Sequence, residues 1–182
     1  NTFDSYRIDD IKYLIKNNPK KIILTSNEID KKTKIYSAKT SSDVIPTFII
    51  ACRPTRQKGL HYLKLILSKI EKLFNPSQIK FILCLPEKNY EGNKIIYRLL
   101  HDKKINKFLK INFNCSDQDL KKIFSIRFSY FISLSRCEYD PYGLIEPLSK
   151  GCPTFAFPAG GAKHFYGLTT YTSIDALIFY IK

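Results

Sequence analysis

Runs of consecutive apolar residues alternate, along most of this chain, with segments in which apolar residues recur every three or four positions. The first pattern is typical of buried strands, and the second is typical of helices that bury one side. The sequence therefore predicts strands at residues 21–25, 47–52, 79–85, 108–113, 130–134 and 154–157. It predicts helices at residues 9–17, 60–73, 93–101, 117–125, 145–150 and 173–181.

Strand and helix alternate in this order, which indicates a parallel sheet covered by helices on both faces. Short links join the predicted elements, and only the polar segment 30–42 is long enough for an extended loop. Ser116 and Asp119 have the spacing of a capping box, which places the start of one helix between them. We therefore expect residues 1–182 to form a single α/β domain, a Rossmann-like, doubly wound parallel sheet.

Composition is that of a globular domain, because 44% of the 182 residues are hydrophobic and 25% are charged. No run of 18 apolar residues occurs, so no membrane-spanning helix is expected. The chain starts at Asn1 and contains no Met, which favours an excised or processed piece of a larger protein. Five cysteines without a C-x-x-C pair suit reduced thiols and a cytoplasmic location.

A net charge of +14 admits three classes of anionic partner: nucleic acid, a membrane surface and a phosphorylated substrate. The lysines are scattered, and no recognition motif for nucleic acid accompanies them. No specific nucleic acid is therefore expected, whereas peripheral contact with an anionic membrane stays open. The three histidines show no spacing with acids or cysteines that indicates a metal site.

Residues 135–153 contain two carboxylates, Glu138 and Glu146, separated by seven residues. Pro141 and Gly143 between them argue against one continuous helix through the pair. We therefore expect Glu138 on a loop leaving the strand at 130–134, and Glu146 in the first turn of the helix that follows. Both would face the crevice at the carboxyl ends of the strands, where open α/β sheets bind ligands.

A second candidate group follows the strand at 47–52. Arg53 and Lys58 lie five residues apart across a turn that ends at Gly59, immediately before a predicted helix. Helix N-termini favour anions through their free N–H groups and the helix dipole. Two cations at such a point are suited to a single anion.

These two groups carry a resemblance to a known family. Residues 135–138, together with Glu146, Gly151 and Pro153, resemble the E-x7-E signature of retaining GT-B glycosyltransferases of group 1 (family 4). Residues 53–59 are similar to the Gly-Arg-x-x-x-x-Lys-Gly segment of that family, with Cys52 in place of the first Gly. The resemblance covers nearly all of the chain and corresponds to the C-terminal half of a two-domain GT-B fold.

The resemblance implies a role for each of the matching positions. Arg53 and Lys58 would bind the diphosphate of a nucleotide-sugar donor and stabilise the leaving group, while Glu138 would hold the transferred sugar. Glu146 would hold the ribose, and the backbone amides of Gly143 and Leu144 would meet a phosphate.

The whole protein would then be a retaining hexosyltransferase that uses neither a metal nor a cofactor. A missing N-terminal domain would hold the acceptor, a saccharide or a lipid-linked molecule. The isolated chain would be inactive.

The match is imperfect at two places. The Pro-x-Gly-Leu segment ending at Leu144 lies two residues later than in the family, so an alternative register pairs Asp140 with the first glutamate and leaves Leu148 at the second. Residues 81–86 lack the glycines that the family has there. These departures favour the alternative function, a non-catalytic GT-B-like binding or interaction module, whereas the intact E-x7-E pair opposes it.

Overall fold

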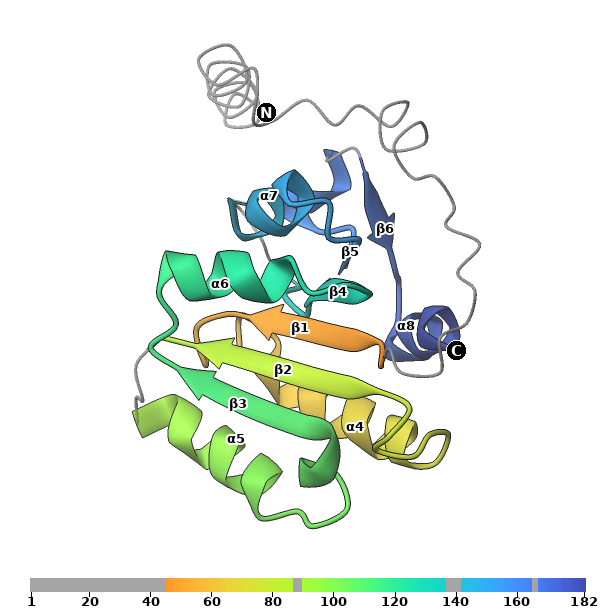
Figure 1. Ribbon diagram of the computed structural model, residues 1–182. Helices are drawn as coiled ribbons and strands as arrows, with labels where there is room; N and C mark the ends of the chain where they lie inside the picture. The colour runs from red at the N-terminus through yellow and green to blue at the C-terminus, as the bar shows by residue number, and fades with distance from the viewer. Residues whose placement is uncertain (1–44, 87–89, 137–141, 165–166) are drawn as a thin grey trace.

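The structure, a computed structural model, describes residues 45–86, 90–136, 142–164 and 167–182 as a parallel sheet with helices on both faces (Figure 1). The order β3-β2-β1-β4-β5-β6 is that of a doubly wound Rossmann-like domain, and all neighbouring strands are parallel. The predicted fold class is thus confirmed. The strands are β1 (Thr47–Ala51), β2 (Lys80–Leu85), β3 (Leu109–Phe113), β4 (Ser129–Ser133), β5 (Thr154–Ala156) and β6 (Leu168–Thr170).

Helices occupy the segments that the hydrophobic spacing predicts between these strands. The helix and strand predicted at 9–17 and 21–25, and the loop predicted at 30–42, lie outside the described residues. Strand β6 was not predicted, because only three residues form it and they are not buried. The helices are η1 (Leu60–Tyr62), α4 (Leu63–Glu71), α5 (Tyr90–Leu100), η2 (Asn106–Phe108), α6 (Asp117–Phe124), α7 (Tyr142–Ser149), η3 (Gly160–His164) and α8 (Ile174–Ile181).

The two faces of the sheet have separate cores. Phe48 and Ile50 of β1 point to the face covered by α4, α5 and α8, whereas Ile49 between them packs with residues of α6 and α7 on the other face. Burial of both faces explains why the strands read as continuous apolar runs. The two helix layers are visible in Figure 1.

Local signals set the ends of two helices. The predicted capping box at α6 is present: Asp119 N–H donates to Ser116 Oγ (3.2 Å), and Ser116 N–H donates to Asp119 Oδ2 (3.0 Å). Helix α7 ends in a Schellman motif, because Cys152 N–H donates to Pro147 O (3.0 Å) and Gly151 N–H to Leu148 O (2.9 Å). Gly151 has the left-handed φ of 72° that this motif requires, so its place in the sequence motif has a structural cause.

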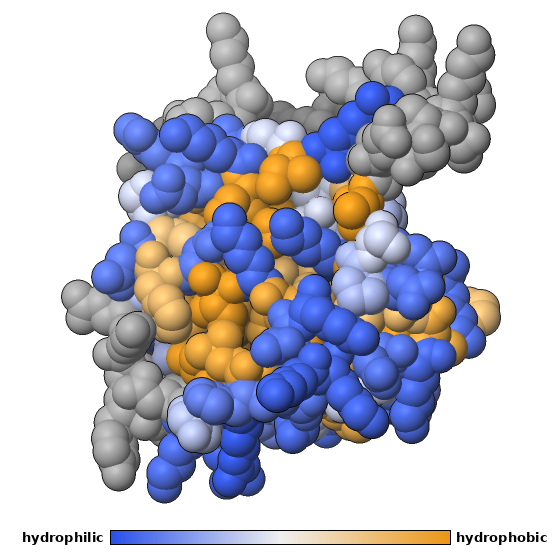
Figure 2. All heavy atoms as spheres, turned by 60° about the horizontal axis from the view of Figure 1, so that its bottom comes forward, coloured by the Kyte–Doolittle hydropathy of each residue, from blue (hydrophilic) through white to orange (hydrophobic). Residues whose placement is uncertain are grey.

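Hydrophilic side chains gather on the side of the molecule that carries α5, with hydrophobic residues exposed between them (Figure 2). Within the described ranges, none of the helices has both the length and the apolar character needed to cross a membrane.

Candidate functional site

β1 and β4 are parallel neighbours, and the strand order reverses between them; doubly wound sheets bind ligands at the carboxyl ends of the strands at this position. A hollow of about 110 Å³ lies there. It is lined by residues from β1 and the loop that follows it, from the end of β4, and from the start of α7: Ile50, Ala51, Cys52, Lys58, Phe131, Ile132, Ser133, Leu134, Ser135, Gly143 and Leu144. Lys58 of the second predicted group therefore lines the same hollow as Gly143 and Leu144, which lie between the two predicted glutamates in the sequence.

The loop after β1, residues 53–59, is fixed against the end of β4. Within the loop, Gly59 N–H donates to Arg56 O (2.9 Å) and Lys58 N–H to Thr55 Oγ1 (3.4 Å). Across to β4, the Ser135 hydroxyl donates to Gln57 O (3.2 Å). Ser135 itself is buried. This anchoring holds the half-buried Lys58 at the wall of the hollow.

Arg53 occupies a different position from Lys58. It directly follows Cys52, which lines the hollow, but the Arg53 side chain is exposed and is not part of the lining. The structure thus places the lysine at the hollow and the arginine in solvent beside it. An exposed arginine in this position is free to reach a ligand that extends out of the hollow.

Gly143 and Leu144 both line the hollow. They are the second and third residues of α7, so their N–H groups are among those that lack a partner inside the helix. The positive end of the helix dipole lies at the same point. Lys58 and the first turn of α7 therefore present positive charge and N–H donors to a common volume.

Glu146 is placed differently from the prediction. Helix α7 begins at Tyr142, directly after Pro141 in the sequence, so Glu146 is its fifth residue and lies in the second turn, not the first. The prediction was wrong because it kept Gly143 outside the helix, whereas the helix accommodates both Gly143 and Pro147. Glu146 is half-buried and does not line the hollow, and its carboxylate has no hydrogen bond or ion pair to any described residue.

The first motif carboxylate is not placed. Glu138 and the alternative, Asp140, both lie outside the described residues. The choice between the two registers therefore stays a prediction.

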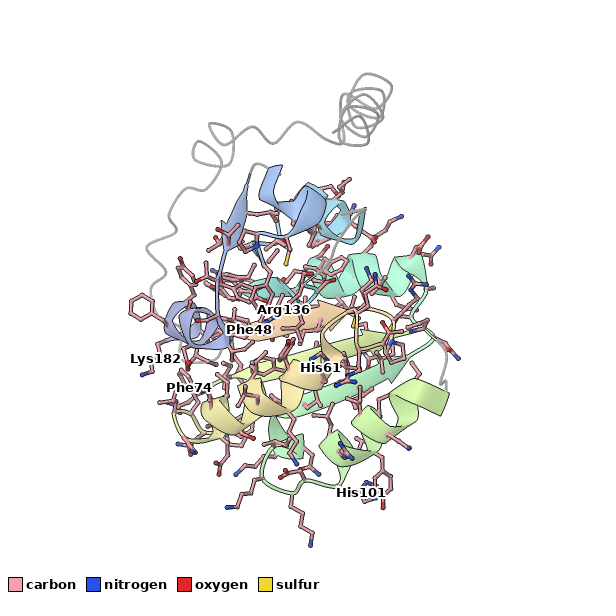
Figure 3. All side chains as sticks on the ribbon, turned by 180° about the vertical axis from the view of Figure 1, so that it is seen from behind. Phe48, His61, Phe74, His101, Arg136 and Lys182 are labelled. Atoms are coloured by element: carbon pink, nitrogen blue, oxygen red, sulfur yellow. The ribbon has the colours of Figure 1, made fainter. Side chains whose placement is uncertain are left out.

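A further arginine, for which the sequence analysis proposed no role, follows the end of β4. The guanidinium carbon of Arg136 lies 4.8 Å from the centre of the Tyr62 ring and 5.0 Å from that of Phe157. The ring of His61 also packs on Tyr62, at 4.0 Å between centroids, and Figure 3 shows His61 and Arg136 from behind the sheet. Tyr62 and Phe157 lie 95 positions apart, so no local pattern indicates this arrangement.

These charges affect His61. Partial burial of the ring, followed by the positive charges of Arg56 and Arg136, lowers the pKa of His61 below its usual value. The imidazole is therefore neutral near pH 7. The positive charge at this side of the loop comes from the arginines.

Three thiols lie near the carboxyl ends of β1, β2 and β3. Burial, followed by the neighbouring Cys115 thiol, raises the pKa of Cys84 to about 12. Cys52, Cys84, Cys115 and Cys152 are not part of a disulfide bond. In the described part of the chain, His, Cys, Asp and Glu residues form no group of three that is positioned to hold a metal ion.

Neither a protein-family model nor a curated protein sequence matches this chain. Solved structures with a similar fold are GT-B glycosyltransferases. OtsA, in its apo structure, aligns with 85% of this chain at a TM-score of 0.63 and 15% identity, and the aligned region is 40% of OtsA.

Two further similar structures are of proteins that form or bind a nucleotide. A UDP-forming α,α-trehalose-phosphate synthase from Burkholderia xenovorans aligns with 75% of this chain (TM-score 0.61, 12% identity, 36% of that protein). The catalytic domain of starch synthase IV from Arabidopsis thaliana, bound to ADP and acarbose, aligns with 78% (TM-score 0.56, 17% identity, 31% of that protein). The chain thus spans well under half the length of these proteins. At such identities the likeness establishes the GT-B-type Rossmann fold.

Proposed function

We propose that this chain is the donor-binding domain of a retaining GT-B glycosyltransferase. The observation that carries the proposal is the shared hollow at the switch point, where Lys58 meets the first turn of α7. A cation and free helix N–H groups are complementary to a phosphate. Starch synthase IV, a fold neighbour, has ADP bound.

The size of the hollow suggests which part of a donor it receives. Its volume of about 110 Å³ is well below the roughly 300–1,000 Å³ of pockets that enclose a whole small molecule. A nucleotide sugar would therefore place its diphosphate in the hollow and extend its two ends outside. In this arrangement Arg53, in solvent beside the hollow, adds its charge to the diphosphate, and Glu146 receives the ribose hydroxyls.

The reaction assigned to such a site breaks the bond between the anomeric carbon and the diphosphate, through an oxocarbenium-like state. The negative charge that develops on the leaving nucleoside diphosphate is stabilised by Lys58 and Arg53, which is why we propose that the enzyme needs neither a metal nor a cofactor. Glu138 would hold the sugar during transfer. An N-terminal domain would hold the saccharide or lipid-linked acceptor, and the transferred group would be a hexose.

Binding of nucleoside diphosphates, followed by calorimetry over a panel of bases in the presence of EDTA, tests this function. We expect saturable binding of at least one nucleoside diphosphate and much weaker binding of the matching nucleoside. Absence of saturable nucleotide binding would instead support the non-catalytic interaction module, which the missing glycines at residues 81–86 favour.

A further inference from the structure

A second, wider hollow lies on the outer side of α4 and α5. Its volume is about 440 Å³, and none of its lining residues also lines the hollow at the switch point. Four cationic side chains and one carboxylate surround it, together with a tyrosine and a histidine: Lys64, Tyr97, Arg98, His101, Asp102, Lys103 and Lys104. We call these seven residues the basic hollow.

Most of the positive charge in the basic hollow is uncompensated. Asp102 forms an ion pair with Lys64 at 3.3 Å, so the single carboxylate is already engaged. Arg98, Lys103 and Lys104 are exposed and form no ion pair within the part of the chain that the structure describes. Three cations therefore face solvent on a surface that has one occupied acid.

Exposed apolar side chains accompany these cations. Tyr97 is 61% exposed and its ring stacks on His101 at 3.7 Å between centroids. Leu65, which follows Lys64 in the sequence of α4, is 48% exposed, and Leu100, which precedes His101 in the sequence at the end of α5, is 45% exposed. This side of the molecule comes forward in Figure 2, where hydrophobic residues are exposed among hydrophilic ones.

We propose that the basic hollow, with Leu65 and Leu100, docks the protein on an anionic membrane surface. Lysines and arginines next to a bilayer are attracted by anionic headgroups, while leucine and tyrosine side chains enter the boundary between headgroups and acyl chains. A nucleic acid would use the cations but would gain nothing from two exposed leucines. The combination of both side-chain types therefore selects the membrane, and it does so independently of the glycosyltransferase activity.

Sedimentation of the 182-residue chain with vesicles tests the proposal. We expect binding to vesicles of phosphatidylcholine and phosphatidylglycerol in equal parts, weakening as salt is raised, and no binding to phosphatidylcholine alone. Each lysine near such a surface contributes about 1 kcal/mol, so Lys103→Glu combined with Lys104→Glu should weaken binding roughly 30-fold or more. Failure of the unmodified chain to bind the anionic vesicles would overturn the proposal.

A charge-matched control separates the basic hollow from the net charge of the protein. Lys121→Glu combined with Lys122→Glu removes the same charge from exposed positions of α6, on the opposite face of the sheet. We expect this control to retain vesicle binding within about threefold. Equal losses in the two double variants would show that net charge alone attracts the protein, and the proposal would then be wrong.

The apolar residues distinguish a membrane from a nucleic acid. Tyr97→Ser combined with Leu100→Ser leaves every charge in place and should weaken binding to the anionic vesicles at least tenfold. Vesicle binding that is unchanged in this variant would contradict insertion. If the chain bound duplex RNA more tightly than vesicles, and the Lys103/Lys104 variant abolished that RNA binding, the basic hollow would be assigned to nucleic acid instead. The thermal midpoints of the Lys103/Lys104 and Tyr97/Leu100 variants should match that of the unmodified chain, since all four positions are exposed.

Discussion

Gly59 lies directly against the backbone of Leu134, where the loop after β1 meets the end of β4. A Cβ atom at Gly59 would overlap the carbonyl oxygen of Leu134 and come within 3.0 Å of the Leu134 Cβ. Gly59 also has a left-handed φ of 71°, which other residues rarely adopt. Both the close contact and the left-handed φ therefore require glycine at this position. The contact also positions Lys58, the preceding residue, at the hollow.

Gly59→Ala should destabilise the domain and displace the loop that carries Lys58. Left-handed backbone costs alanine roughly 1–2 kcal/mol, and overpacking adds roughly 1–3 kcal/mol, so a total loss of about 2–5 kcal/mol in the free energy of unfolding is expected. Urea denaturation measures this loss. Nucleoside diphosphate binding, measured under conditions where the variant is folded, should weaken as well.

Gly151→Ala is the matched control for this prediction. Gly151 has nearly the same φ, 72°, but no atom lies within 4 Å of a Cβ at this position. Only the backbone term then applies, so we expect a loss of about 1–2 kcal/mol in stability and unchanged nucleotide binding. A Gly59 variant no less stable than the Gly151 variant would show that the contact with Leu134 is unimportant.

Lys58→Ala and Arg53→Ala should each weaken binding of a nucleoside diphosphate at least tenfold while leaving nucleoside binding nearly unchanged. A charge-assisted hydrogen bond contributes about 1.5–3 kcal/mol, which sets this magnitude. Calorimetric titration with both ligands measures the difference. Arg127→Ala, which removes an exposed cation before the start of β4, should leave both affinities unchanged. Equal losses for nucleoside and diphosphate would exclude phosphate contacts by Lys58 and Arg53.

Glu146→Gln should weaken binding of every nucleotide that carries a ribose diol, because the amide keeps the shape of the side chain but loses its charge. Comparison of ribonucleotide and 2′,3′-dideoxynucleotide binding measures this effect, since the second ligand should not respond to the substitution. The position of Glu146 in the second turn of α7, outside the hollow, is compatible with a partner that extends from the diphosphate.

Glu138→Gln and Asp140→Asn decide the register of the motif. We expect Glu138→Gln to weaken binding of the sugar-bearing donor and to spare the plain nucleoside diphosphate, because its proposed partner is the sugar. Asp140→Asn should have little effect on either ligand. In the opposite result, the Glu138 variant would bind the donor normally and the Asp140 variant would bind it weakly. This would establish the shifted register, in which Glu146 does not hold the ribose.

The 182-residue chain should bind donor nucleotide but transfer little or no sugar. Transfer requires an aligned acceptor and the exclusion of water, which GT-B sites achieve by closing two domains on the crevice. Radiolabelled sugar transfer to a panel of acceptors measures the activity. Robust transfer by this chain would show that the second domain is unnecessary.

Stability should fall at high pH because of Tyr171. This tyrosine is buried and its hydroxyl donates to Ser133 O at 2.6 Å. Burial raises the pKa of Tyr171, and the positive charge of Arg136 lowers it only in part. The neutral form is thus favoured in the folded state.

The sign of the effect follows from the raised pKa. The contribution of Tyr171 is complete below the unfolded pKa of about 10 and is lost as the pH rises above it, by up to about 1.4 kcal/mol per pH unit. Urea denaturation between pH 8 and 11 should show this slope. Tyr171→Phe should lower the free energy of unfolding by about 1 kcal/mol at pH 8. Above pH 10 the stability of this variant should depend less on pH than that of the unmodified chain. An unchanged slope in the variant would assign the alkaline loss to other groups.

The sequence by itself determined the order and type of the described elements, with the exception of β6 and the short 3₁₀ helices. Doubly buried strands and one-sided helices differ in the spacing of their apolar residues, and that spacing is local. Local chemistry also set the start of α6, where Ser116 and Asp119 need only each other. The position of Lys58 at a strand-to-helix turn could be predicted from the sequence for the same reason.

Only the tertiary structure decided where α7 begins and what surrounds the hollow. The proline and glycine residues within 141–147 favour, as a local pattern, a helix that starts later. In the folded protein α7 starts at Tyr142, and Leu144 packs into the core on the α6 side. Arg136 lies between two rings that come from η1 and from the segment after β5. Such contacts join residues far apart in the chain, so their geometry follows from the assembled sheet and not from any local sequence pattern.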